Sequence, residues 1–133
     1  MTEQIATEAR AFEIRLVLAM SHARTRAAVR RALETTGEIV VVAEVTSALQ
    51  VLQVARAEPV DIVMFDLGLV PPGSSPSLAC VVRSLHGIPV VAVGLDADPA
   101  FAHAARAAGA ISHVLTDASP EDYLGAVLSA THR

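Results

Sequence analysis

DIVMFDLGL, residues 61–69, is the stretch of this chain that decides the fold. Four consecutive apolar residues end in an acid, Asp66, and a glycine-containing turn follows at once. A continuous apolar run of this length, unlike an alternating one, is typical of a parallel strand that is covered on both faces. We therefore expect a buried strand over Ile62–Phe65, with Asp66 at its carboxyl end.

Four further apolar runs lie on either side of this stretch. The predicted strands are Ile14–Ala19, Ile39–Val45, Ile62–Phe65, Pro89–Val93 and Ser112–Leu115. Segments of helical character separate them, and strands that alternate with helices imply right-handed crossovers and a parallel sheet. The sequence thus predicts an α/β fold, a doubly wound five-stranded parallel sheet. We expect one domain over residues 13–131, an N-terminal extension over residues 1–12, and no output domain.

The helices show their own boundaries. Over Ala23–Thr35, helical periodicity puts the small and apolar side chains on one arc and the arginines on the other. The apolar arc is Ala28, Val29, Ala32 and Leu33, and the basic arc is Arg24, Arg26, Arg30 and Arg31. We expect the basic arc to be a solvated helix face. Ser119 and Pro120 have the types preferred at a helix start and predict the beginning of the last helix. A helix of small side chains is expected over Pro99–Ala108.

Composition excludes several classes of protein. The net charge is −4 and the ten basic residues are all arginine, so the chain contains no lysine. A negative balance argues against a nucleic-acid binder, whose affinity normally begins with a positive face. No apolar run approaches the ~18 residues of a membrane span, and the amino-terminal residues do not resemble a secretory signal. We expect a cytoplasmic protein that is not inserted in the membrane.

The order and spacing of these segments resemble the receiver domain of bacterial response regulators. The resemblance rests on EIRLVLAMSHARTRAAVRRALE, GEIVVVAEVTSALQVLQVARAEPVDIVMFDLGL, IPVVAVG and ARAAGAISHVLTDASPEDYLGAV. It implies a flavodoxin-like (βα)5 fold with strand order 2-1-3-4-5. AAGA followed by TDASPED is most similar to the subfamily that usually carries a helix-turn-helix output domain. DIVMFD looks like the phospho-acceptor strand, with Asp66 at the acceptor position.

The resemblance also implies a set of partners for that aspartate. In the family, two acids after the first strand bind Mg²⁺ with it, a Ser or Thr follows the fourth strand, and a Lys follows the fifth. Here Met20 and Ser21 replace the acids, Gly94 replaces the Ser or Thr, and Thr116 replaces the Lys. No acid lies between Glu13 and Glu34, and there is no lysine to shift into register. A carboxylate without a metal, cation or hydroxyl beside it is a poor phosphoryl acceptor.

We therefore expect weak or absent Mg²⁺ binding, and Asp66 as an inactive acceptor that caps a turn or accepts a hydrogen bond from the loop starting at Leu67. The family's switch aromatic, in the fifth strand, corresponds to His113. We interpret His113 as a half-exposed structural residue rather than a pH sensor. With Gly94 unable to pull on it, the usual switch is expected to be disconnected.

The alternatives lack the residues they need. The first strand-to-helix turn, AMSHAR, contains no glycine for a phosphate-binding loop, and no nucleophile elbow is present, so we expect no enzyme activity and no cofactor. The favoured hypothesis is a stand-alone atypical response regulator that binds a protein partner or a larger assembly independently of phosphorylation. A homodimer through the fourth helix, fifth strand and fifth helix stays open. So do a working phospho-acceptor at Asp66 and an excised receiver domain of a DNA-binding regulator.

Overall fold

The computed structural model describes residues 13–71, 73–94 and 99–131. The predicted extension, residues 1–12, lies outside this range. The elements are β1 (Ile14–Ala19), α2 (Ala23–Glu34), β2 (Ile39–Val45), α3 (Ala48–Ala57), β3 (Ile62–Asp66), the 3-10 turn η1 (Leu67–Leu69), α4 (Leu78–Ser84), β4 (Val90–Gly94), α5 (Pro99–Ala107), β5 (Ser112–Leu115) and α6 (Pro120–Thr131). Three predicted strands agree at both ends. The fourth begins one residue later than expected, at Val90.

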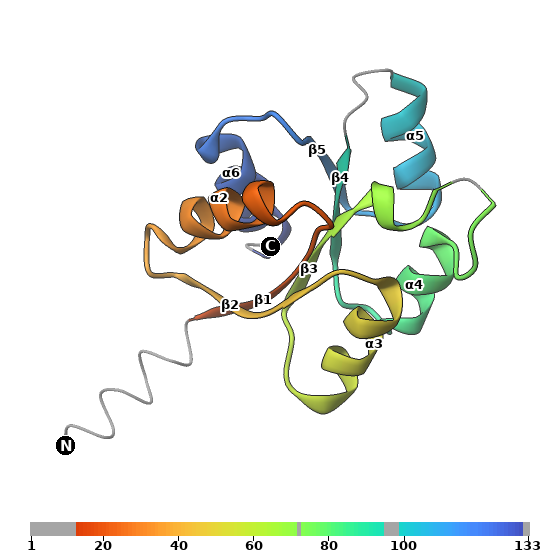
Figure 1. Ribbon diagram of the computed structural model, residues 1–133, viewed down its shortest axis with the longest axis horizontal. Helices are drawn as coiled ribbons and strands as arrows, with labels where there is room; N and C mark the ends of the chain where they lie inside the picture. Colours follow the sequence, from red (N-terminus) through yellow and green to blue (C-terminus); the bar gives the residue numbers. More distant parts are fainter. Residues whose placement is uncertain (1–12, 72, 95–98, 132–133) are drawn as a thin grey trace.

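The five strands form one parallel sheet in the order β2-β1-β3-β4-β5. Helices α2 and α6 cover one face, and α3, α4 and α5 cover the other (Figure 1). This confirms the predicted fold class and strand order. β3 lies at the centre between β1 and β4, so the carboxyl ends of these three strands lie side by side at one end of the sheet, where ligands of such folds bind. No helix in these ranges is both long and apolar enough to cross a membrane.

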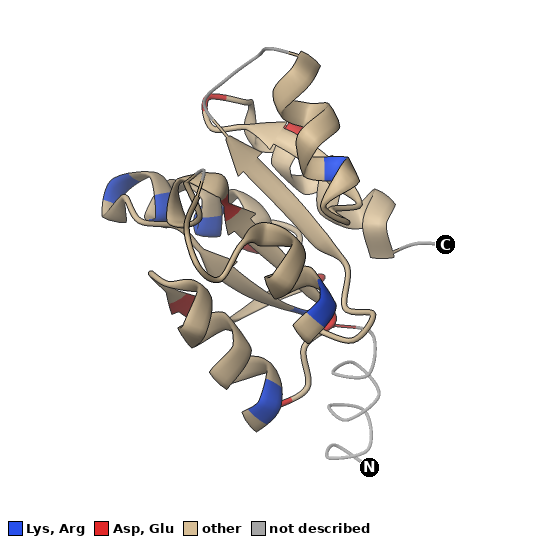
Figure 2. Cartoon of the chain, turned by 90° about the vertical axis from the view of Figure 1, so that its right-hand side faces the viewer, with Lys and Arg blue, Asp and Glu red and all other residues tan. Residues whose placement is uncertain are grey.

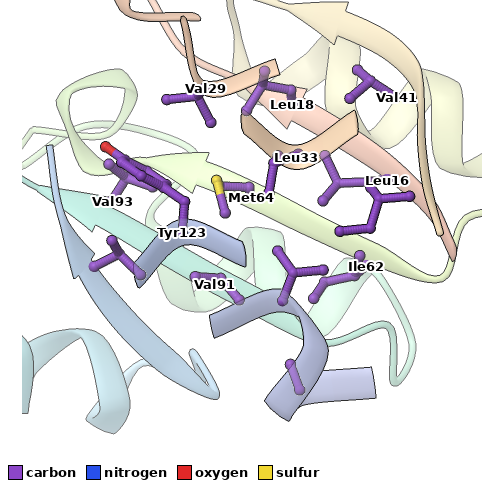
Figure 3. Close-up of a cluster of buried hydrophobic side chains, with 14 of the residues drawn as sticks. Leu16, Leu18, Val29, Leu33, Val41, Ile62, Met64, Val91, Val93 and Tyr123 are labelled. Atoms are coloured by element: carbon purple, nitrogen blue, oxygen red, sulfur yellow. The ribbon is translucent and has the colours of Figure 1, made fainter. Parts of the chain in front are cut away.

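Alternate residues of the central strands enter two separate cores. Leu16, Leu18 and Met64 face α2 and α6 in the cluster shown in Figure 3. Val63 and Phe65 belong to the second cluster, beneath α3 and α4. Because both faces are buried, Ile62–Phe65 must be apolar at every position, which is the pattern that predicted a covered parallel strand.

Helix α2 differs from the expected amphipathic arrangement. Val29 and Leu33 are buried, but Ala28, assigned to the same arc, is exposed. The basic arc is only partly solvated, because Arg26 and Arg30 both form ion pairs with Glu44 of β2. The side-chain hydrogen bonds from Arg30 and then Arg26 lower the pKa of the Glu44 carboxyl.

These two arginines therefore connect α2 to β2 through ion pairs with Glu44. Helical periodicity predicts the face on which an arginine lies but not the residue with which it pairs. Arg24 and Arg31 are exposed as predicted. Figure 2 marks the positions of the basic and acidic residues on the cartoon of the described residues.

Candidate functional site at the carboxyl edge of the sheet

Asp66 closes β3 and is held from two sides. Its Oδ1 accepts a hydrogen bond of 2.8 Å from the backbone N–H of Gly68, which caps η1. Its Oδ2 accepts a hydrogen bond of 3.3 Å from the hydroxyl of Ser21, which follows β1. The structure thus brings Ser21 and Asp66 together and places Asp66 in the turn-capping role expected from the sequence.

Met20, at a position where the family carries an acid, belongs to the core rather than to the edge. Its side chain is only 1% exposed and packs in the cluster beneath α2 and α6. Its backbone carbonyl accepts a hydrogen bond of 2.9 Å from Nη1 of Arg26. A carboxylate at this position would have to be buried among apolar side chains, which is costly for a charged group.

The donors around Asp66 fit Mg²⁺ poorly. The ion demands near-octahedral oxygen coordination and is usually held by carboxylates together with water or phosphate. This edge supplies the carboxylate of Asp66, the hydroxyl of Ser21 and the buried thioether of Met20. In the ranges that the structure describes, no three His, Cys, Asp or Glu side chains gather as a metal site would require.

Gly94, the last residue of β4, lies beneath an aromatic side chain. A Cβ atom built on Gly94 would lie 2.5 Å from Cε1 of Phe101 and 3.1 Å from Nε2 of His113. Real Cβ atoms essentially never approach another atom within 3.0 Å. The Phe101 ring, from α5, therefore occupies the space that a Ser or Thr side chain would need at this position.

Phe101 and His113 form a pair above β4. Their ring centroids are 5.8 Å apart and their planes meet at 65°, an edge-to-face arrangement. Nε2 of His113 is buried and has no hydrogen-bond partner among the described residues. Burial lowers the pKa of His113 below its usual value. The His113 side chain is thus turned toward Gly94 and packed there as a neutral ring.

Thr116 contributes backbone rather than side-chain chemistry to this edge. Its N–H donates a hydrogen bond of 2.8 Å to the carbonyl of Gly94, which ties the end of β5 to β4. Its carbonyl accepts a hydrogen bond of 2.7 Å from the hydroxyl of Tyr123. Tyr123 lies along the core beneath α6, with its hydroxyl oxygen at the rim of the cluster (Figure 3).

Burial raises the pKa of Tyr123 to about 12, and the charges of Asp117 and Asp66 add to the effect. The hydroxyl is therefore a neutral donor at physiological pH.

Sequence reasoning missed Phe101 and Tyr123 at this edge, and it assigned Arg26 only to a solvated helix face. Phe101 had a visible signal, because it is the one aromatic side chain in an alanine-rich helix that begins just after Gly94. Tyr123 is the only tyrosine of the chain, but the pattern of the last helix shows only that its side chain is buried.

Comparison with known proteins agrees with this geometry. No family model and no curated protein matches the chain. Among solved structures, it is similar to the signal receiver domain of the response regulator NarL from Mycobacterium tuberculosis, with 26% identity, a TM-score of 0.77, and coverage of 91% of this chain and 98% of that one. The chain has the receiver fold and is similar, over most of its length, to receiver domains of response regulators.

Two further structures show the same likeness to this receiver domain. A LuxR-family response regulator from Aurantimonas sp. SI85-9A1 has 26% identity and a TM-score of 0.78, with 88% of this chain and 84% of that one covered. The response regulator ChrA of a heme-sensing two-component system has 28% identity and a TM-score of 0.69, with 90% of this chain covered. This receiver domain spans only 57% of the ChrA chain.

Proposed function

We propose that this receiver domain is a protein-interaction module whose binding state does not depend on phosphorylation of Asp66. In this proposal it is an atypical, pseudo-receiver member of the family that works in the cytoplasm, without enzyme activity, as an accessory or regulatory subunit of a larger assembly. The observation that carries the proposal is the Phe101 ring packed over Gly94, which fills the space where the family's switch hydroxyl would stand.

Two further features support phosphorylation independence. Phosphoryl transfer depends on positioning and on neutralising charge, and the chain has no lysine to pair with the phosphoryl group. Met20 is committed to the core, so the metal-binding acid next to Ser21 has no counterpart. Mg²⁺ binding is accordingly proposed to be weak or absent.

A working phospho-acceptor is the second candidate. Asp66 is only half-buried, and its Oδ2 contacts a single side-chain hydroxyl, at 3.3 Å, so one oxygen faces an incoming group without a strong competitor. This candidate requires Mg²⁺-dependent labelling of Asp66 that Asp66→Asn abolishes.

The test of the interaction role uses the chain tagged at its native expression level. Co-purification should recover a partner at fixed stoichiometry, and Asp66→Asn, which keeps the shape of the side chain, should leave that stoichiometry unchanged. The proposal is wrong if the chain elutes only as monomer or homodimer, or if Asp66→Asn releases the partner. A homodimer through α5, β5 and α6 would elute without a partner protein, and it would therefore contradict the proposal.

A further inference from the structure

A groove runs along the free edge of the sheet, between β5 and α6. Its volume is about 610 Å³. The residues that line it are Ile111, Ser112, His113, Val114 and Leu115 from β5 and its approach, and Ala118, Glu121, Asp122, Gly125, Ala126, Ser129 and Ala130 from α6 and the turn before it. Of these residues, His113 also belongs to the site described above, where its ring is turned toward Gly94.

The β5 wall offers backbone hydrogen-bonding groups. Among the described residues, β5 is the last strand of the sheet and pairs with β4 alone. The N–H of Ile111 donates to the carbonyl of Val90 at 2.8 Å, and in a parallel ladder alternate residues point the same way. Ser112 and Val114 therefore direct their N–H and C=O groups away from the sheet, into the groove, as the unpaired groups of an edge strand do.

The side chains on the α6 side of the groove are small, which leaves room for a second backbone to approach β5. Gly125, Ala126 and Ser129 present small side chains, and a Cβ atom at Gly125 would meet nothing within 4 Å. Glycine in a helix interior costs about 1 kcal/mol relative to alanine. At Gly125 that cost goes together with open space on the α6 side of the groove.

One end of the groove is acidic. Glu121 and Asp122 lie in the first turn of α6, at the carboxyl end of β5, and both are exposed. Neither forms an ion pair with another described residue, whereas the acids Glu34, Glu44 and Glu58 are all paired with arginines. The free negative charge is complementary to a basic side chain on whatever occupies the groove.

We propose that this groove binds an extended segment of a partner protein as a sixth strand beside β5, with an Arg or Lys of that segment next to Glu121 and Asp122. The inference rests on the proposed interaction role and names its binding surface. Strand addition uses main-chain hydrogen bonds for affinity and neighbouring side chains for specificity. The outward backbone groups of Ser112 and Val114 supply the main-chain hydrogen bonds that give affinity. The acidic end of the groove supplies the side chains that give specificity.

The experiment selects ligands from a displayed library of random 12-residue peptides on the full chain. Gly125→Gln is the test variant and is used only after selection on wild type, because it fills the groove with an uncharged side chain and replaces a glycine within a helix. Ala28→Gln is the matched control: it adds the same side chain at an exposed position of α2, on another element. Selected peptides should carry a basic residue, bind wild type and Ala28→Gln equally, and lose at least tenfold in affinity on Gly125→Gln.

Amide hydrogen exchange then identifies the binding mode. A bound strand should protect the amides of Ser112 and Val114, which point away from β4, and the double substitution Glu121→Gln with Asp122→Asn should weaken binding several-fold at low salt. Absence of groove-dependent peptides, peptides that leave both amides unprotected, or protection that grows with chain concentration alone would each overturn the proposal. The last result would assign the groove to a second copy.

The two proposals fail separately. If peptide affinity is unchanged by both Asp66→Asn and Gly125→Gln, the groove proposal is wrong but the interaction role is not contradicted. Groove binding that appears only after phosphorylation of Asp66 contradicts phosphorylation independence and leaves the groove standing.

Discussion

Gly94→Ala tests whether Phe101 really occupies the space above β4. The new Cβ would start 2.5 Å from Cε1 of Phe101 and would need 3.4 Å or more for ordinary contact, so the ring must shift by roughly an ångström. Overpacking of this kind costs about 1–3 kcal/mol. Gly94 has no positive φ, so alanine adds no backbone strain, and the gain of about 0.4–1 kcal/mol from restricting the unfolded chain opposes the steric cost. Urea denaturation of both proteins measures the change in unfolding free energy.

Phe101→Ala provides the decisive comparison. With the ring removed, only the 3.1 Å contact with Nε2 of His113 remains, so Gly94→Ala should cost much less than in wild type, and the double-mutant cycle should show a coupling of about 1–3 kcal/mol. Gly125→Ala is the matched control, because its Cβ meets nothing within 4 Å and the substitution should stabilise the helix by up to ~1 kcal/mol. If Gly94→Ala is as stable as wild type, or if the two substitutions are additive, Phe101 does not fill this space.

Three further predictions concern single groups. Tyr123 is the only tyrosine and there is no tryptophan, so absorbance titration should show its phenol ionising near pH 12; a midpoint near 10 would contradict its burial. The pKa of His113 is lowered by burial, so unfolding favours proton uptake and stability should fall as pH drops below about 6.5, by at most ~1.4 kcal/mol per pH unit. His113→Phe should remove that part of the slope between pH 7.5 and 5.5, and parallel slopes would refute it. Glu44→Gln removes the ion pairs between α2 and β2 and should lower the free energy of unfolding by about 1 kcal/mol or less. High salt should reduce this effect. A loss above ~3 kcal/mol would mean that these ion pairs contribute more than exposed pairs normally do.

The fold could be predicted because its pattern is redundant. The strands are short, mostly apolar runs, and turn-forming or capping residues mark most boundaries, as Ser47 does when its hydroxyl accepts a hydrogen bond from the N–H of Gln50. A local error changes little in such a fold. The exposed Ala28 was assigned to the buried arc, yet Val29 and Leu33 alone were enough to place α2 on the sheet.

The site was only partly predictable because its contacts join residues far apart in the sequence. The positions of Ser21 and Asp66 follow from strand ends, which the apolar runs locate. That Phe101 packs over Gly94, or that Arg26 and Arg30 share Glu44, depends on how α5 and α2 sit on the sheet, and periodicity sets only the face of a helix, not its partners.

The most direct measurement is intact-mass analysis of the folded chain after incubation with acetyl phosphate and Mg²⁺, beside Asp66→Asn and a conventional receiver domain as the positive control. The account predicts that the conventional domain gains a phosphoryl group while wild type and Asp66→Asn keep their masses. A phosphoryl adduct on wild type that Asp66→Asn removes would contradict it and make Asp66 a working acceptor.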